Sequence, residues 1–277
     1  MIGMGEMGAA IAQRLAERGG RVVTPLAGRS AASVARAQAV GAHAVTPDAL
    51  GQADIILSVV PPAAAPRVAA ECLPHLASRA HPPLFIDCNA IAPQTVAPVA
   101  ASYETAGVPF GDGSLIGGPP RPGAAGPRLY LSGPVTEAAA TLSALGLDAC
   151  ALSAAIGDAS ALKMAYAGIT KGTQAIGAAM ALGAFRNGAG ESLLAELAAS
   201  QPATLAALSR QLPAMLPKAY RWDGEMREIA RFLEPEAGAA RMMTGAADLY
   251  QHIAEDVAEG EQSEIVQLLR RFRAPQE

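Results

Sequence analysis

Three glycines near the start of the chain have the spacing of a dinucleotide-binding turn. Gly3, Gly5 and Gly8 form the pattern G-x-G-x-x-G, Glu6 and Met7 lie between the last two, and a helical segment follows directly. In this pattern the first glycine permits a tight turn, the second lets the backbone approach a diphosphate, and the third lets the helix pack closely. The N–H groups of the helix N-terminus attract the negative charge. An ordinary glycine turn remains an open alternative, because the chain is rich in glycine and alanine.

The residues about twenty positions beyond such a turn indicate which dinucleotide binds, because domains that prefer NAD place a carboxylate there to hold the ribose hydroxyls. This chain has Gly28, Arg29 and Ser30 instead. An arginine can pair with a 2′-phosphate, and a serine can donate to the same group. The sequence therefore favours NADP(H), with NAD as the alternative cofactor, over a surface arginine in a loop.

A lysine in the second half of the chain is a candidate for acid/base chemistry. Lys163 lies about a turn and a half into a predicted long helix, and Ala167, Thr170 and Gln174 share its face at helical spacing. A lysine that faces a closed cleft is desolvated, which moves its pKa toward the range useful for proton transfer. On position alone, a solvated surface lysine is the commoner interpretation.

The elements that would position these residues follow from the pattern of apolar runs. In the first part of the chain, short apolar runs alternate with helical stretches, which is typical of β-α-β units and a parallel sheet. The predicted strands are 21–26, 55–60, 84–87 and 128–132, and the predicted helices are 9–17, 31–39 and 64–76. Residues 111–127, rich in Gly and Pro, are interpreted as a long functional loop.

Beyond about residue 150 the pattern predicts helices alone. Their expected ranges are 158–185, 191–199, 203–220, 224–232, 237–256 and 263–272. The predicted fold class is therefore α/β, with a doubly wound parallel Rossmann sheet over residues 1–153 and an all-helical domain over 154–277. Because a Rossmann first strand usually has about five residues and only Met1 and Ile2 precede Gly3, we expect the native chain to start upstream, with a shortened strand as the alternative.

Composition excludes several classes of function. With a net charge of -4 and no run of Lys or Arg, the chain does not resemble a nucleic-acid binder. No apolar stretch reaches the roughly 18 residues of a membrane helix, and no signal peptide is expected. The four histidines show no metal-ligand spacing. The three cysteines are odd in number and lack a C-x-x-C pair, so we expect reduced thiols in the protein core and a cytoplasmic location.

Four segments taken together resemble the 3-hydroxyacid dehydrogenase family, which includes 3-hydroxyisobutyrate dehydrogenase and 6-phosphogluconate dehydrogenase. They are 2–8 for the family's cofactor turn, 87–93 for its substrate-contact segment, 112–118 for its glycine-rich substrate loop, and 163–172 for its catalytic helix. The resemblance covers the Rossmann half and the start of the long helix. It implies that the second half is a 6-phosphogluconate dehydrogenase-like helical domain, which closes on the substrate and forms a homodimer.

The resemblance also implies roles for individual residues. Lys163 corresponds to the family's acid/base lysine, which moves the proton of the substrate oxygen while a hydride passes between the nicotinamide and the same carbon. Small 3-hydroxy or 3-oxo acids and β-hydroxy amino acids are the implied substrates. The other implied contacts are Asn89, Gly117 and Gly118 at the substrate or nicotinamide end, and Val59, Val60 and Pro61 at the nicotinamide ribose.

The departures from the family pattern indicate changed substrate contacts. Ala167 stands where the family has an asparagine, and Ile116 stands where it has a serine. The glutamate and the phosphate-binding tyrosine of phosphogluconate dehydrogenase correspond to Thr170 and Lys171 here, so decarboxylation of phosphogluconate is not expected. Thr170 and Lys171 become candidate substrate-binding residues, Lys171 for an anionic group. This combination is typical of a poorly characterised branch with a short helical C-terminal domain.

Two other functions stay open. Imine reductases share the architecture but generally replace the lysine that Lys163 matches. A non-catalytic dinucleotide sensor would suit the short first strand and the missing asparagine.

Overall fold

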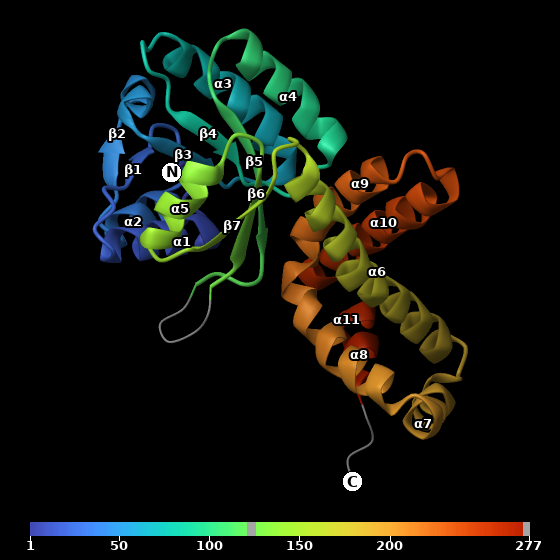
Figure 1. Cartoon of the computed structure of the whole chain (residues 1–277). Helices are drawn as coiled ribbons and strands as arrows, with labels where there is room; N and C mark the ends of the chain where they lie inside the picture. The colour runs from blue at the N-terminus through green and yellow to red at the C-terminus, as the bar shows by residue number, and fades with distance from the viewer. Residues whose placement is uncertain (121–125, 274–277) are drawn as a thin grey trace. The chain divides into compact units, whose positions relative to one another are not determined.

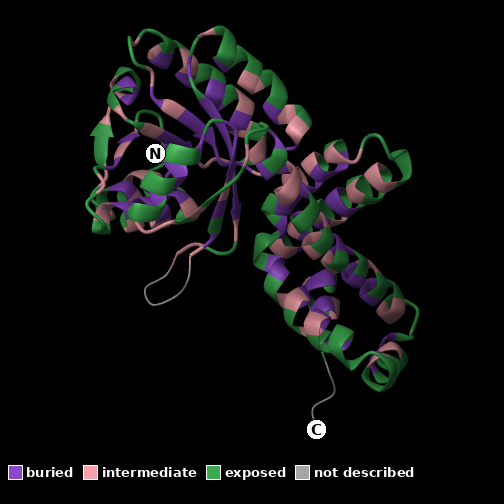
Figure 2. Cartoon of the chain, in the orientation of Figure 1, coloured by how far each residue is buried: buried purple, intermediate pink, exposed green. Residues whose placement is uncertain are grey.

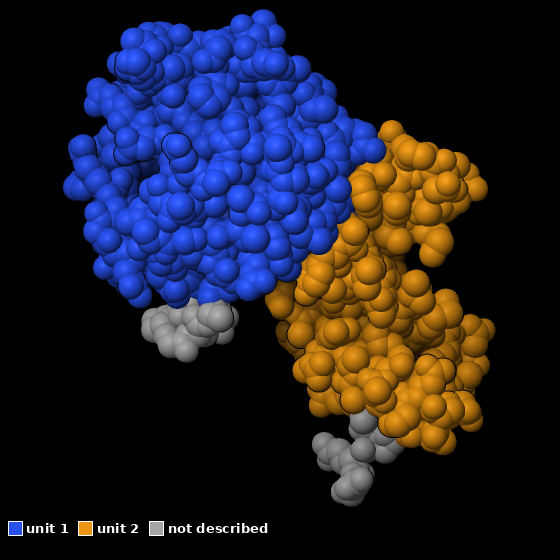
Figure 3. Space-filling model, viewed as in Figure 1, with its two compact units in different colours: residues 1–164 blue, residues 165–277 orange. Residues whose placement is uncertain are grey.

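The computed structural model describes residues 1–120 and 126–273. The chain forms two compact units, residues 1–164 (unit 1) and residues 165–277 (unit 2), shown in Figure 3. The division falls inside the long helix α6 (Asp158–Arg186), whose first two turns belong to unit 1. The domain boundary predicted at 153/154 lies just before this helix.

Unit 1 is built on a mostly parallel sheet (Figure 1). The pair β1 (Val23–Pro25) and β2 (His43–Val45) is parallel. The other five strands lie side by side in chain order: β3 (Ile55–Ser58), β4 (Leu84–Asp87), β5 (Phe110–Ile116), β6 (Arg128–Ser132) and β7 (Asp148–Ser153). The predicted Rossmann-type sheet is confirmed, with one exception: β5 and β6 run antiparallel.

Two residues at the start of the chain join these two groups of strands. The terminal amine of Met1 donates to the Val23 carbonyl at 2.8 Å. Ile2 N–H donates to the Leu57 carbonyl, and Val59 N–H donates to the Ile2 carbonyl, each at 2.8 Å. Met1 and Ile2 therefore occupy the place of a central strand between β1 and β3. The resulting order is that of a Rossmann sheet, and the glycine turn begins at the point where the strand order reverses.

Helices cover both faces of this sheet, so unit 1 has two core clusters (Figure 2). One cluster includes Ile11 and Leu142, and the other is built around Phe85, Tyr103 and Phe110, whose rings lie 4.9 to 6.0 Å apart. The helices of unit 1, besides the start of α6, are α1 (Glu6–Glu17), α2 (Ala31–Ala39), α3 (Ala65–Ala77), α4 (Pro93–Thr105) and α5 (Thr136–Ala144), with 3₁₀ turns η1 (Pro47–Gln52) and η2 (Pro62–Ala64).

The prediction of a long loop over residues 111–127 is wrong for its first part, because residues 111–116 belong to the buried strand β5. Its glycines serve packing rather than a turn. A Cβ at Gly111 would lie 2.6 Å from a Val135 methyl, and one at Gly113 would lie 3.0 Å from the Cys88 sulfur. Residues 121–125 of the predicted loop lie outside the described residues. The elements β2, α4, α5 and β7 were not predicted from the sequence.

The prediction that all three cysteines fill the core is wrong for Cys150, which is exposed on the edge strand β7. Cys72 and Cys88 are buried, and burial raises the thiol pKa of Cys72 to about 11 and that of Cys88 well above its usual value.

Unit 2 is all-helical, as predicted. Beyond α6 its helices are α7 (Gly190–Ser200), α8 (Pro202–Met215), α9 (Trp222–Phe232), α10 (Ala237–Glu259) and α11 (Glu264–Arg271), with the 3₁₀ helix η3 (Leu216–Arg221) between α8 and α9. The single helix predicted over 203–220 is thus two elements, because Pro217 cannot continue the α-helical hydrogen bonds. Across the described residues, no helix is both long and apolar enough to span a membrane.

Candidate active site

The glycine turn has the backbone geometry that the sequence pattern predicts. Gly3 has a φ of +90°, and a Cβ there would lie 2.1 Å from the Val59 carbonyl oxygen. A Cβ at Gly8 would lie 2.0 Å from the Gly3 oxygen, so α1 can approach the turn only with glycine at this position. Around Gly5, the N-cap of α1, a Cβ would meet no atom within 4 Å. The turn and the first-turn N–H groups of Glu6 and Met7 therefore leave room for the diphosphate of a dinucleotide.

The segment after β1 carries positive charge and no carboxylate between residues 26 and 36. Gly28 turns the chain with a φ of +70°, Arg29 is exposed, and Ser30 caps α2 by accepting from the Ser33 N–H at 3.3 Å. A second arginine, which the sequence analysis missed, ties α2 to the glycine turn, since Arg36 Nε donates to the Met4 carbonyl at 2.7 Å. These residues fit the 2′-phosphate end of NADP(H).

The segment after β3 is held by the buried side chain of Asn89. Asn89 Oδ1 accepts from Val60 N–H at 2.6 Å, and its Nδ2 donates to Ser58 Oγ at 3.3 Å. The amide thus joins the end of β3 at Ser58 to the Val59-Val60-Pro61 segment that follows it. A direct contact between Asn89 and substrate stays a prediction.

Four buried polar residues lie in one row across the sheet, which we call the polar row: Ser58, Asp87, Asp112 and Ser132. Asp87 accepts from Asn89 N–H at 2.9 Å, while its Oδ2 has no hydrogen-bond partner among the described residues. Burial raises the pKa of Asp87 to about 7, and the neighbouring Asp112 carboxylate adds to the rise. Asp87 and Asp112 belong to the segments that resemble the family's substrate contacts, but their alignment with Ser58 and Ser132 in one row was not predicted from the sequence.

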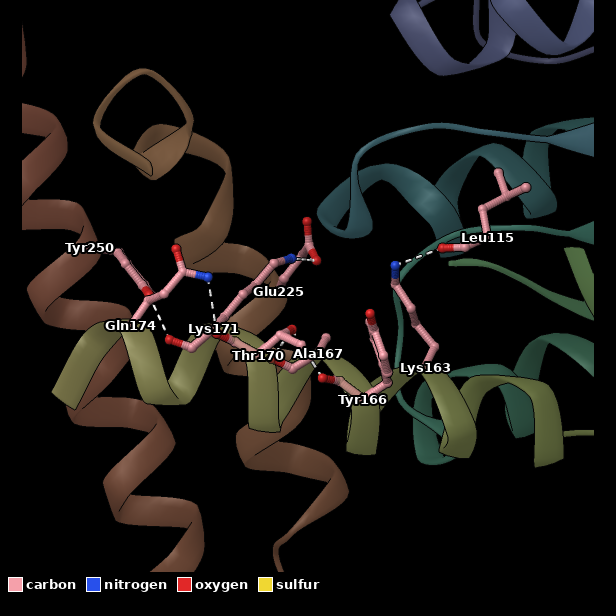
Figure 4. A network of polar contacts seen from close by, with 9 residues as sticks. All are labelled: Leu115, Lys163, Tyr166, Ala167, Thr170, Lys171, Gln174, Glu225 and Tyr250. Atoms are coloured by element: carbon pink, nitrogen blue, oxygen red, sulfur yellow. Dashed lines mark hydrogen bonds and ion pairs between the residues drawn. The ribbon is translucent and has the colours of Figure 1, made fainter. Parts of the chain in front are cut away.

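Lys163 lies in unit 1 together with the glycine turn. Its Nζ donates to the Leu115 carbonyl at 2.7 Å (Figure 4). Leu115 is two residues before the exposed pair Gly117 and Gly118, just beyond the end of β5. Gly117 has a φ of +126°, which only glycine adopts readily. The lysine amine is thus tied to the strand that leads into the predicted substrate loop.

Thr170 and Lys171 lie further along α6, in unit 2. Thr170 Oγ1 donates to the Tyr166 carbonyl at 3.0 Å. Lys171 forms an ion pair with Glu225, a partner that was not predicted from the sequence (Figure 4). Its Nζ also lies 5.2 Å from the centre of the Trp222 ring. Burial lowers the pKa of Lys171, and Glu225 opposes that shift. The charge predicted to bind an anionic substrate is therefore already matched by a carboxylate.

No group of three or more His, Cys, Asp or Glu side chains within the described ranges could hold a metal ion.

Family comparisons cover both ends of the chain. Residues 1–90 match the family described as NADP oxidoreductase coenzyme F420-dependent, and residues 184–253 match a domain of unknown function (DUF1932). The first match contains the glycine turn and the Arg29–Ser30 segment, so the predicted cofactor class, NADP(H), is confirmed. No curated protein matches the chain.

Solved structures extend the comparison over the whole chain. The conserved protein MTH1747, described as structurally similar to 3-hydroxyacid dehydrogenases, is 28% identical with a TM-score of 0.69, over 92% of this chain and 95% of that one. The predicted family resemblance is confirmed. A member of this family, 3-hydroxyisobutyrate dehydrogenase from Mycobacterium tuberculosis with L-serine, shares the fold at 19% identity, with a TM-score of 0.68 over 99% of this chain and 98% of that one. An imine reductase from Myxococcus stipitatus with NADP+ shares the fold at 20% identity, with a TM-score of 0.55 over 98% of each chain.

The raised pKa of Asp87 predicts a pH-dependent stability. Between about pH 4 and pH 7 the folded chain holds a proton on Asp87 that the unfolded chain releases, so the free energy of unfolding falls as pH rises through this window. At about 1.4 kcal/mol per pKa unit, the loss is at most about 4 kcal/mol.

Thermal melts of wild type and Asp87→Asn from pH 5 to pH 8 measure this loss. The stability of wild type relative to the variant should fall as pH rises. The buried Met1 amine, whose pKa burial lowers to about 6, acts in the opposite direction but is common to both proteins. Parallel curves would refute the assignment to Asp87.

Proposed function

We propose that this protein is an NADP(H)-dependent oxidoreductase that transfers a hydride between nicotinamide and a small 3-hydroxy or 3-oxo acid, or a β-hydroxy amino acid, with Lys163 as its acid/base. The observation that carries the proposal is the hydrogen bond from Lys163 Nζ to Leu115, 2.7 Å long. It ties the amine to β5 within the same unit as a glycine turn built for a diphosphate.

In the proposed reaction, separate residues bind the cofactor, orient the substrate and transfer the proton. The bound cofactor supplies the hydride, so the protein has to orient the reactants and move one proton. A lysine ammonium has three donors, and the bond to Leu115 fixes the direction of the amine from which the substrate oxygen would receive its proton. Asn89 holds the segment that would carry the nicotinamide ribose, and the backbone at Gly117 and Gly118 would receive the substrate carboxylate. Thr170 remains a candidate substrate contact, and Lys171 would bind an anionic part of the substrate only in exchange for its ion pair with Glu225.

Replacing the lysine tests the central claim. Lys163→Met keeps the length of the side chain but removes the proton donor, so turnover should fall by about 10² to 10⁴ while NADPH binding stays within about twofold. Turnover is measured by the absorbance of NADPH with a panel of 3-hydroxy acids, 3-oxo acids and β-hydroxy amino acids. Lys218→Met, at an exposed lysine of unit 2, is the matched control. Full turnover in Lys163→Met would exclude the proposed role.

Cofactor preference tests the residues after β1. Arg29→Ala removes the charge that would pair with the 2′-phosphate, so the Kd for NADPH should rise about tenfold or more while the Kd for NADH changes little. Arg186→Ala, at an exposed arginine of α6, should leave both values unchanged. An equal loss of both cofactors would assign Arg29 to the shared part of the dinucleotide.

The imine reductases among the structural neighbours give the second candidate function. The same assay with cyclic imines separates it from the first, because an imine reductase would reduce these and leave the hydroxy acids unchanged. NADPH binding without turnover in either panel would indicate a dinucleotide sensor.

We also propose a homodimer that forms through unit 2. One face of α6 exposes Tyr166, Ile169, Ile176 and Met180, which are 50%, 72%, 55% and 61% exposed. An apolar groove between α6 and α10 adjoins this face, lined by residues that include Ile176, Met242 and Met243. Large exposed apolar faces on soluble proteins mark association sites, and in a twofold-symmetric dimer the same face of each copy meets its counterpart.

A charge on this face should separate the subunits. Ile176→Glu places a carboxylate where the two copies would meet, so the mass measured by light scattering after gel filtration should halve at micromolar concentration. Tyr220→Glu, at a side chain 74% exposed on η3, is the control and should keep the wild-type mass. A monomeric wild type, or a dimeric Ile176→Glu, would contradict the proposed interface.

A further inference from the structure

The first turn of α6 is held by one buried carboxylate that the proposed chemistry does not use. Asp112 Oδ2 accepts from Gly157 N–H at 3.1 Å and from Ser160 N–H at 2.9 Å, and its Oδ1 accepts from Ser160 Oγ at 2.6 Å. Ser132 Oγ donates to the same Oδ2 at 3.1 Å. Asp112 is fully buried, so these four donors take the place of its lost hydration.

Through these contacts, side chains of β5 and β6 accept hydrogen bonds from the N–H groups at the start of α6. N–H groups in the first turn of an α-helix have no partner inside the helix. Asp112 accepts from Gly157 N–H, directly before the helix, and from Ser160 N–H in its first turn, while Ala159 N–H donates to Ser132 Oγ at 3.1 Å. A carboxylate at this place also interacts favourably with the helix dipole. The start of α6 is thereby fixed on β5 and β6 by a group that lies 45 residues earlier in the chain than Gly157.

The same strand holds the helix at a second point. Asp112 binds the helix at Ser160, and Leu115, three residues further along β5, accepts from Lys163 Nζ, three residues further along α6. Strand and helix are thus joined at two places that lie three residues apart along each element. A shift or rotation of the helix start would move the amine away from the end of β5, because a helix transmits such a change along its rigid backbone.

We propose that Asp112 is a positioning residue that sets the place of the Lys163 amine through the first turn of α6. The inference rests on the proposed function for the importance of that amine to turnover. The position of the amine itself can be measured without a substrate.

The chain offers a direct test, since Lys163, Lys171 and Lys218 are its three lysines. Reductive methylation with formaldehyde, followed by peptide mass spectrometry, gives the labelling rate of each. In Asp112→Asn the Nδ2 group cannot accept the donors, so Lys163 should be labelled at least about fivefold faster relative to the exposed Lys218. The labelling of Lys171 should not change. Asp148→Asn, at an exposed carboxylate on β7 that pairs with Arg128, is the matched control and should leave all three rates unchanged.

Hydrogen exchange separates positioning from general loosening. In Asp112→Asn the amides of Gly157 and Ser160 should exchange about tenfold faster, while those of β3 keep their wild-type rates. Faster labelling of Lys163 together with faster exchange in β3 would show a structural effect alone and overturn the proposal. A labelling rate within twofold of wild type would overturn it as well.

A milder variant keeps the test decisive if Asp112→Asn does not fold. Ser160→Ala removes one of the four donors and leaves the charge, so Lys163 should be labelled about twofold faster, and an unchanged rate would count against the proposal. Where a substrate is found, Asp112→Asn should lower kcat about tenfold or more with the KM for NADPH within twofold. A wild type without turnover would refute the proposed function, and the labelling result would still decide the role of Asp112.

Discussion

Polar groups buried in a protein need partners there, and the four side chains of the polar row find most of theirs in the segments that form the candidate site. Ser58, Asp87, Asp112 and Ser132 come from four adjacent strands and lie in register. Ser58 and Asp87 bind Asn89, which holds the segment after β3. Asp112 and Ser132 bind the start of α6. One row thus supports both the segment predicted to carry the nicotinamide ribose and the helix that carries Lys163.

The two carboxylates of the row differ in the hydrogen bonds that they receive. Asp112 receives four donors, whereas Asp87 receives one backbone N–H and keeps an unpartnered oxygen within the described chain. Burial raises the pKa of both, and hydrogen bonds oppose the rise at each. The hydrogen bonds to Asp112 hold the start of α6, whereas Asp87 keeps one oxygen that no described group binds.

Local patterns were sufficient to predict much of this fold. The strand 84–87 and the helix 31–39 were predicted at the bounds that the structure shows, and the glycine turn follows from three residues whose backbone geometry permits little else. The strand β5 was not predicted because glycines such as Gly111 and Gly113 are typical of loops. In the structure, the close approach of neighbouring side chains requires glycine at both positions. The partners Asp112 for α6 and Glu225 for Lys171 could not be predicted, since pairing across 45 or 54 residues depends on tertiary structure.

The uneven burial of the three thiols makes the molecule well suited to site-directed spectroscopy. Cys72 and Cys88 are enclosed, with thiol pKa values above the usual range, whereas Cys150 faces outward on β7. A maleimide dye should therefore attach at one known point of unit 1 without any engineered substitution. Energy transfer from the reduced nicotinamide to that dye would then report cofactor occupancy in the unaltered protein.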